Sequence, residues 1–409
     1  MRIRFFVLSV FTLIQAAHAD IYLPQIFGDN MVLQRESEVF LYGWASPNET
    51  FVITTGWDDK THEVKTGINA KWKVKVNTPK AGGPYQIAFN GTKNSIVLKN
   101  ILIGEVWLCS GQSNMEWSAN NGIDNEEEEI KNADYPSIRL FTVEKRTALV
   151  PQEDVAGNWQ VCSPESMAEF SAVGYFFAKR IYEKLKIPVG LVDASWGASC
   201  AEVWTPEYVF KEKPDLLKSH ESIKPNQWVP IERSILFNAM IAPLTDFNIS
   251  GVLWYQGETN TANGESYKEL FTGLIRSWRK EWSIDFPFYF VQIAPFQYGR
   301  PYQGAVVRDQ QRQALFLEKT AMVVTSDICT VDDIHPQNKQ DVGLRLANVA
   351  LKEHFKVLTT EVHGPLYKSV KFNKNKATVY FEHAEGLYFT NTDEMFFELA
   401  GDDGIYHKA

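Results

Sequence analysis

Cysteine is scarce in this sequence: its 409 residues include only four, Cys109, Cys162, Cys200 and Cys329. Their wide spacing matches no zinc-binding pattern, so we expect no structural metal ion and no cofactor. Four cysteines allow three disulfide pairings, but two of them lie in apolar runs, which favours buried free thiols. The fold must therefore rest mainly on its hydrophobic core.

Positive charge and long apolar runs are also lacking. The formal net charge is −9 and no basic stretch stands out, which argues against nucleic acid or an anionic membrane as the main partner. Beyond the amino terminus, no run reaches the ~18 apolar residues of a membrane-spanning helix. Aromatic residues, in contrast, make up 13% of the chain. Aromatic rings suit the stacking of sugars, although most of them should simply fill β-sheet cores.

The first 19 residues are typical of a signal peptide. Arg2 and Arg4 precede an apolar run over residues 5–14, which is too short to cross a bilayer. Ala17-His18-Ala19 then fits the small-x-small cleavage pattern. We expect a mature chain beginning at Asp20 and exported to the periplasm or the exterior. No cysteine follows the cleavage site, so no bacterial lipid anchor is expected.

Residues 20–100 predict an all-β domain. Runs at 39–44 and 51–54 are strand-like, and residues 71–76 alternate strictly between lysine and apolar side chains. Turn residues separate these runs, as in a small β-sandwich. This domain contains no polar constellation, so we expect it to support the rest of the protein or to present substrate.

Residues 101–358 alternate between strands and helices, which predicts a doubly wound parallel α/β sheet. Residues 359–409 return to β character. They read as an incomplete β domain or as strands that complete the amino-terminal sandwich. Within the α/β part, the clearest strands are predicted at 187–192, 249–255, 288–293 and 321–325, and the clearest helices at 163–185, 267–278 and 342–349.

One short stretch, residues 104–117, stands out chemically. An apolar run up to Cys109 predicts a buried strand, and small and amide residues follow it abruptly. Ser113 would then lie at the carboxyl end of a strand, where open α/β sheets place their ligand sites. It could be a nucleophile or the cap of the next helix. The stretch is not the Gly-x-Ser-x-Gly elbow of α/β-hydrolases, because Met115 replaces the second glycine.

The same arrangement, an apolar strand followed by small or polar residues, recurs at Gly197, Asn260 and His335. Four such strand ends can converge in one crevice. Acyl transfer needs a base for the serine, a group that orients the base, and donors for the oxyanion. His335 is the candidate base, although a single histidine after a strand is more often structural. The candidate oxyanion donors are the backbone N–H groups of Ser113 and Gly197 and the side-chain amide of Asn260.

Four ordered segments together resemble the sialate O-acetylesterase family of SGNH-type serine hydrolases. The four letters name Ser, Gly, Asn and His, which match the four strand-end residues above. The resemblance implies a flavodoxin-like SGNH sheet flanked by β strands, and a metal-independent esterase that removes acetyl groups from sugar hydroxyls. The segments are Gly-Gln-Ser-Asn-Met (111–115), Ala-Ser-Trp-Gly (194–197), Trp-Tyr-Gln-Gly-Glu-Thr-Asn (254–260) and Asp-Ile-His-Pro-Gln-Asn-Lys (333–339).

The resemblance also suggests roles for neighbouring residues. SGNH enzymes commonly place an orienting Asp three residues before the His, which selects Asp332, with Asp333 as the rival and a Ser–His pair as a further alternative. Family members usually continue beyond position 409, so the carboxyl-terminal domain is expected to be partial. For Trp254 the alternative to a pocket role is core packing, and for Arg308 a helix-end ion pair. The residues expected to bind substrate are Gln112, Trp196, Trp254, Gln256, Glu258 and Arg308.

The sequence therefore predicts an exported carbohydrate esterase that acts on an O-acetylated sugar, most simply an acetylated sialic acid. The first alternative keeps the chemistry and changes the substrate to acetylated xylan or pectin. The second belongs to another class, a non-catalytic sugar-binding protein. The presence of Ser113, Asn260 and His335 together argues against that second alternative.

Overall fold

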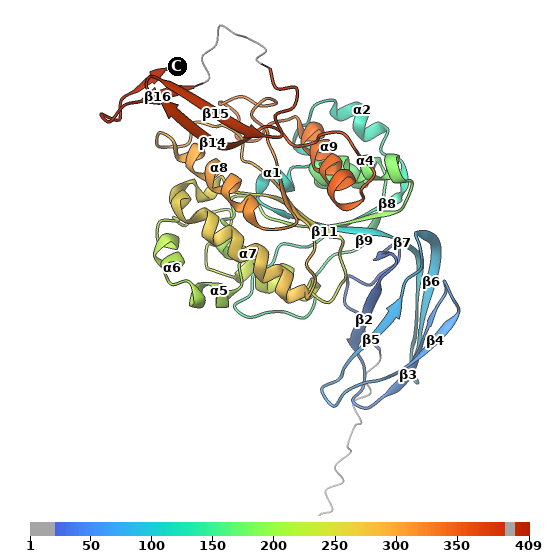
Figure 1. Cartoon of the computed structure of the whole chain (residues 1–409). Helices are drawn as coiled ribbons and strands as arrows, with labels where there is room; N and C mark the ends of the chain where they lie inside the picture. The colour runs from blue at the N-terminus through green and yellow to red at the C-terminus, as the bar shows by residue number, and fades with distance from the viewer. Residues whose placement is uncertain (1–20, 389–396) are drawn as a thin grey trace, which may run out of the picture. The chain divides into compact units, whose positions relative to one another are not determined.

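The computed structural model describes residues 21–388 and 397–409. The predicted signal peptide, residues 1–19, and its cleavage site lie outside the described residues. The chain divides into a large compact unit that ends at Val357 and a small unit, Leu358–Ala409 (Figure 1). Within the described residues, no helix is long and apolar enough to cross a membrane.

The amino-terminal part of the large unit is a β-sandwich. Strand β2 pairs with β5, and the second sheet has the order β4-β3-β6-β7-β1. Trp72 of β5 joins the two sheets, because its ring contacts Phe51 and Phe89 at centroid distances of 5.1 and 5.9 Å. The strands are β1 (Val32–Gln34), β2 (Glu38–Trp44), β3 (Thr50–Thr55), β4 (Lys60–Lys65), β5 (Lys71–Asn77) and β6 (Gly82–Asn90).

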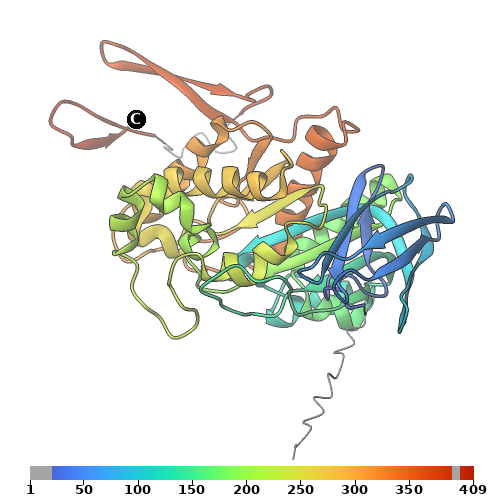
Figure 2. The ribbon, with the colours of Figure 1, turned by 90° about the horizontal axis from the view of Figure 1, so that it is seen from below.

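Strand β7 (Ser95–Gly111) belongs to both halves of the large unit. Its first residues pair with β6 and β1 in the sandwich, and residues from Glu105 onward pair with β10 and β11 in the parallel sheet. The sandwich, drawn in blue, therefore lies at one end of that sheet (Figures 1 and 2). The predicted domain boundary at residue 100 falls inside this strand.

The parallel sheet has the order β13-β12-β11-β7-β10-β8-β9. When the two edge strands β8 and β9 are set aside, the remaining five follow the flavodoxin-like order 2-1-3-4-5. The predicted doubly wound fold is thus confirmed, with β8 and the antiparallel β9 added at one edge. The strands are β8 (Tyr135–Thr142), β9 (Trp159–Cys162), β10 (Val189–Ser195), β11 (Gly251–Tyr255), β12 (Phe288–Val291) and β13 (Thr320–Val323).

Helices cover both faces of this sheet. Cys109 contacts Gly174 of α4, whereas Trp254 packs on Phe271 of α7. Cys109 is in register with Leu253, the residue before Trp254, so the two contacts lie on opposite faces. Helix α9 packs beside α4, and α8 beside α7. The helices are α1 (Ser113–Glu116), α2 (Glu126–Lys131), α3 (Pro164–Glu169), α4 (Ala172–Leu185), α5 (Glu207–Glu212), α6 (Asp215–His220), α7 (Tyr267–Trp282), α8 (Gln303–Gln313) and α9 (Lys339–Val349).

The single helix predicted over residues 163–185 is wrong, because the chain forms two helices there. Ser163 caps α3 as expected, but Phe170 adopts an extended conformation and ends it. Ser171 then starts α4 by accepting a hydrogen bond from the Gly174 N–H, 3.1 Å away. The apolar residues keep a helical spacing across the break, so this spacing alone could not reveal that the helix is interrupted.

Each of the four cysteines is free, and three of them are buried, in agreement with the predicted free thiols. In the small unit, β14 (Leu366–Asn373) pairs with β15 (Lys376–Glu382), and β16 (Glu398–Ala400) with β17 (Tyr406–Lys408). Among the described residues these strands pair only with each other.

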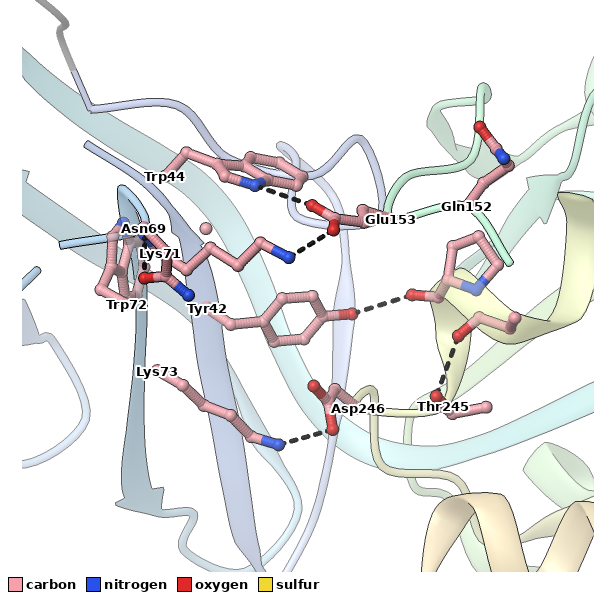
Figure 3. A pocket seen from close by; sticks show the side chains of 13 residues that line it. Tyr42, Trp44, Asn69, Lys71, Trp72, Lys73, Gln152, Glu153, Thr245 and Asp246 are labelled. Carbon is pink, nitrogen blue, oxygen red and sulfur yellow. Dashed lines mark hydrogen bonds and ion pairs between the residues drawn. The ribbon is translucent and has the colours of Figure 1, made fainter. Parts of the chain in front are cut away.

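A cavity of about 360 Å³, lined by both polar and apolar side chains, lies where the sandwich meets the α/β part (Figure 3). Lys71 forms an ion pair with Glu153, and Lys73 forms one with Asp246 at 2.5 Å. The Tyr42 hydroxyl donates across the same gap to a backbone carbonyl, 3.4 Å away. These contacts join the two parts of the large unit at the end of the sheet opposite Ser113.

Candidate active site

The turn after β7 sets the position of Ser113. At Gly111 the backbone φ is +139°, and a side chain there would clash with the Tyr255 carbonyl, so only glycine fits. The Gln112 N–H donates to that carbonyl over 3.0 Å. Ser113 is the first residue of α1 and Gln112 occupies the cap position, so Ser113 is not a helix cap. It lies at the carboxyl end of the first strand of the 2-1-3-4-5 order, where such sheets bind ligands.

His335 lies against Ser113 although 222 residues separate them. Its Nε2 is 2.8 Å from the Ser113 Oγ, within reach for proton transfer. The imidazole stacks on Trp117, with ring centroids 4.4 Å apart and planes 20° apart. Burial, assisted by the nearby Lys339 ammonium and opposed by Asp333, lowers the pKa of His335. A lowered pKa favours the neutral ring that a general base requires.

The carboxylate predicted to orient His335 is not at the ring. Asp332 accepts a hydrogen bond from the Gln297 side chain at 3.2 Å, and Asp333 accepts from the backbone N–H of His335 at 2.8 Å. Within the described part of the chain, the imidazole has no hydrogen bond other than that to Ser113. Asp333 thus closes the loop before His335 by binding its backbone, and the Asp332 side chain is directed to Gln297 and not to the imidazole. The geometry is therefore that of a Ser–His pair.

Gly197 reaches the site, but its N–H is occupied. An added side chain on Gly197 would lie 3.4 Å from the Ser113 Cβ, so the two residues are close neighbours. The Gly197 N–H donates to a carboxylate oxygen of Glu116 over 2.5 Å, and Glu116 also pairs with Lys145. In this structure a carboxylate thus holds the donor that was predicted for the oxyanion.

Asn260 does not occupy the predicted oxyanion position. Its side chain is fully buried, and its amide nitrogen donates to Glu202 at 2.9 Å and to Asn263 at 3.0 Å. Its amide oxygen accepts from the Ala201 N–H at 2.8 Å and from Gln256 at 2.7 Å. Because both amide hydrogens are engaged, Asn260 ties buried segments together instead of facing Ser113.

Gln112 has the free amide that Asn260 lacks. Its side-chain oxygen accepts from the backbone N–H groups of Gly257 and Thr259, both at 3.3 Å. Among the described residues its amide nitrogen has no partner, and it lies directly beside Ser113 in the chain. Gln112 was predicted as a substrate-binding residue. Its position next to the serine was the only sequence signal for a donor role.

Two of the other predicted pocket residues are buried core instead. Trp254 packs against four aromatic rings, and Gln256 is fully buried with three side-chain hydrogen bonds. Glu258 is also buried and accepts from Asn114 at 2.7 Å. Trp196 remains partly exposed near Gly197, and its indole N–H donates to a backbone carbonyl at 3.0 Å. Only Trp196 of these four could contact a ligand directly.

Arg308 lines a cavity of about 440 Å³ formed mainly by residues 295–305. Val331, four residues before His335, also lines it. In the described chain Arg308 has no carboxylate partner. It donates to two neutral side chains, and its Nε is buried without a hydrogen bond. The helix-end ion pair considered as an alternative is therefore not formed among the described residues.

Three potential metal ligands lie close together, and one of them, Glu202, is hydrogen-bonded to Asn260. Ligand atoms of Cys200, Glu202 and His220 lie within 4.8 Å of one another. Both oxygens of Glu202 already accept amide hydrogen bonds, from Asn260 and Asn263. This cluster does not contact Ser113 or His335, and the chemistry derived below does not involve it.

Comparison with known proteins identifies the family of this chain. Residues 103–352 match the family described as carbohydrate esterase, sialic acid-specific acetylesterase. The sialate O-acetylesterases of Mus musculus and Homo sapiens are each 29% identical to this chain and align with 90% and 91% of it, covering 80% and 78% of their own lengths. The crystal structure of a carbohydrate acetylesterase from Xanthomonas citri superposes with a TM-score of 0.85 at 32% identity, covering 95% of this chain and 88% of that one. The chain belongs to the sialic acid-specific acetylesterase family of carbohydrate esterases.

Proposed function

We propose that this protein is a serine esterase that removes O-acetyl groups from sugars, sialic acids above all. The observation that carries the proposal is the 2.8 Å contact between Ser113 and His335 at the ligand-binding end of the sheet, in a chain of this family. A non-catalytic sugar-binding protein would not require a half-buried imidazole held against a serine.

The chemistry follows from this pair. Ser113 Oγ attacks the acetyl carbonyl carbon while His335 Nε2 takes its proton. The tetrahedral intermediate collapses, the ester C–O bond breaks, and His335 returns the proton to the departing sugar hydroxyl. A water molecule, deprotonated by His335, then attacks the acetyl-enzyme, and acetate leaves with Ser113 restored.

The oxyanion needs donors near Ser113. We assign this role to the backbone N–H of Ser113, which lies in the unpaired first turn of α1, and to the amide nitrogen of Gln112. The Gly197 N–H becomes a third donor when Glu116 moves aside, since the carboxylate and the oxyanion compete for the same hydrogen.

The imidazole is oriented without a carboxylate in this mechanism. Stacking on Trp117 fixes the plane of the ring, and the Asp333 contact fixes the backbone at His335. We therefore assign a Ser–His pair, with Asp332 on the outer side of the loop.

An acidic sugar is the substrate that the Arg308 cavity favours. The Arg308 guanidinium, which has no carboxylate partner in the described chain, would meet the carboxylate of a sialic acid, and the surrounding loop supplies aromatic side chains for the sugar ring. Acetylated xylan lacks such a carboxylate. Pectin carries one, so it remains the closer alternative and belongs in every substrate panel.

The decisive experiment measures acetate release from O-acetylated sialic acid, acetylated xylan and acetylated pectin by the wild type and by Ser113→Ala. We expect sialic acid to be preferred and Ser113→Ala to lose several orders of magnitude, keeping at most the ~10³–10⁴ over water left when a triad member is removed. Turnover near that of the wild type in Ser113→Ala would refute the assignment.

Export is part of the same proposal and rests on residues 1–19. Expression of the full chain followed by amino-terminal sequencing of the exported protein tests it. A first residue of Asp20 is expected, and an uncleaved cytoplasmic product would contradict it.

A further inference from the structure

Asn114, the residue after Ser113, joins three separate segments at the site. Its side chain is completely buried. The amide nitrogen donates to Glu258 at 2.7 Å and to the backbone carbonyl of Ile334 at 2.8 Å, while the amide oxygen accepts from Lys339 at 2.7 Å. These three hydrogen bonds are directed at segments around Ser113.

Lys339 is the second member of this network. It is the first residue of α9 and is 1% exposed. Its ammonium also donates to the backbone carbonyl of Pro336 at 2.7 Å. Burial lowers the pKa of Lys339 to about 7, although Glu258 and Asp333 favour its charged form. A buried lysine whose charged form is disfavoured lowers the stability of the folded protein. Its presence therefore points to a functional role, and its contacts indicate which one.

Glu258 completes the chain of contacts. One of its oxygens bonds to Asn114, while the other is buried without a partner among the described residues. Burial raises the pKa of Glu258. The carboxylate does not touch Lys339 directly, so Asn114 bridges an acid and a base that are both removed from water.

The network holds the base from both sides. The carbonyls that it binds belong to Ile334 and Pro336, the two residues that flank His335. Asn114 itself is fixed beside Ser113 by α1. The same amide thus locates the loop of the base relative to the nucleophile, while no carboxylate holds the imidazole.

We propose that Asn114, Lys339 and Glu258 form a positioning network that keeps His335 against Ser113 and replaces the orienting carboxylate of a catalytic triad. The proposal rests on the function assigned above. None of the three residues needs to touch substrate, so they act through His335.

Lys339 also acts on His335 through its charge. The groups that affect the imidazole are the Lys339 ammonium, which disfavours imidazolium, and the Asp333 carboxylate, which favours it, with Trp117 stacked on the ring. Replacing Lys339 with methionine removes the positive charge. The pKa of His335 should therefore rise, and the acid limb of the kcat/KM profile should move to higher pH.

The test compares Asn114→Ala, Lys339→Met and Lys339→Arg with a control, Asn238→Ala. Asn238 is a similarly buried asparagine that donates to one backbone carbonyl at 3.1 Å, away from His335. We expect Asn114→Ala to lower kcat about 10²-fold, the scale of a misplacement of about 1 Å, with KM changed less than about threefold. Asn238→Ala should keep the wild-type kcat in its folded fraction.

A second measurement does not depend on turnover. NMR titration of histidine-labelled protein, with the His335 signal assigned from His335→Gln, gives the pKa of that ring directly. It should lie below about 6.5 in the wild type, should rise in Lys339→Met, and should be restored toward the wild-type value in Lys339→Arg. If Asn114→Ala keeps full kcat, or if Lys339→Met leaves the pKa of His335 unchanged, the network does not position the base. Failure of the proposed function would appear differently, as absence of acetate release by the wild type.

Discussion

At the scale of single residues, the nucleophile and the base were predictable, whereas the roles of the amides were not. Ser113 and His335 stood out because each follows an apolar strand and parallel strands end at one edge. Asn260 and Gln112 both follow or adjoin such strands as well. Both are buried, and which of them keeps a free amide depends on partners such as Glu202, which comes from another part of the chain.

Gln112 and Asn260 should respond differently to truncation. Gln112→Ala removes the free amide near Ser113, so kcat should fall roughly 10²–10³-fold. Some stability should be lost as well, because the backbone N–H groups of Gly257 and Thr259 lose their acceptor. Asn260→Ala removes a buried amide with four hydrogen bonds and leaves Glu202 less well satisfied, so the free energy of unfolding should fall by about 1–3 kcal/mol. Kinetics with thermal unfolding on both variants distinguishes them. The opposite pattern would restore Asn260 as the oxyanion donor.

The two aspartates before His335 should matter little to the chemical step. Asp332→Asn removes an exposed contact to Gln297, and Asp333→Asn weakens a backbone contact. We expect kcat to fall less than about tenfold in each, compared with up to ~10⁴ where a carboxylate truly holds the histidine. The measurement is kcat on an aryl acetate, with folding checked by circular dichroism. A loss near ~10⁴ in Asp332→Asn would show that the loop rearranges when substrate binds.

At the scale of elements, most strands and helices were visible in the sequence because hydrophobic periodicity is local. Two of the features that were not visible have a clear physical reason. The helix over residues 163–185 breaks at Phe170 because Ser171 bonds to a backbone N–H, a contact that competes with the apolar period. The strands β8 and β9 extend the sheet at its edge, beyond the five strands of the 2-1-3-4-5 order, and the sequence pattern did not indicate them.

The start of α4 offers a test at this scale. The Ser171 hydroxyl accepts the Gly174 N–H and lies 3.5 Å from the Met115 sulfur in α1. Ser171→Ala should lower the free energy of unfolding by about 1 kcal/mol, as for other helix caps, with kcat nearly unchanged. Urea denaturation and steady-state kinetics measure the two effects. A large loss of kcat without loss of stability would instead mean that α4 controls the position of α1.

At the scale of the whole molecule, the sandwich and the parallel sheet share one core strand and a buried carboxylate. Glu105 lies on β7 where the strand leaves the sandwich and accepts from Arg35 at 2.6 Å and Gln34 at 3.2 Å, and it also contacts Ser250. Burial alone would raise the pKa of Glu105. The hydrogen bonds from His354, Ser250 and Arg35 outweigh burial and lower it to about 2.

This lowered pKa predicts acid sensitivity of the junction. The folded-state pKa of Glu105 is below its unfolded value, so its contribution to stability is full above about pH 5 and is lost as pH falls toward 2. The shift corresponds to about 3 kcal/mol. Glu105→Gln should therefore unfold more readily at pH 6 and lose less stability between pH 5 and 2 than the wild type. Denaturation curves across that range measure the difference. Parallel pH dependence in both proteins would show that Glu105 is not the titrating group.

The shared strand β7 makes the large unit a poor subject for domain shuffling. Alternate residues of a strand face opposite sides, so one residue inserted between Glu105 and Gly111 would turn every later side chain to the other face. The elbow at Ser113 would then point away from His335, although the sandwich and the helices remained intact. Any fusion or chimera that joins a new sandwich to this sheet must therefore keep the same side chains of β7 on the same faces on both sides of the junction. Activity measured for single-residue insertions along β7 would show at which positions the alternation of its side chains must be preserved.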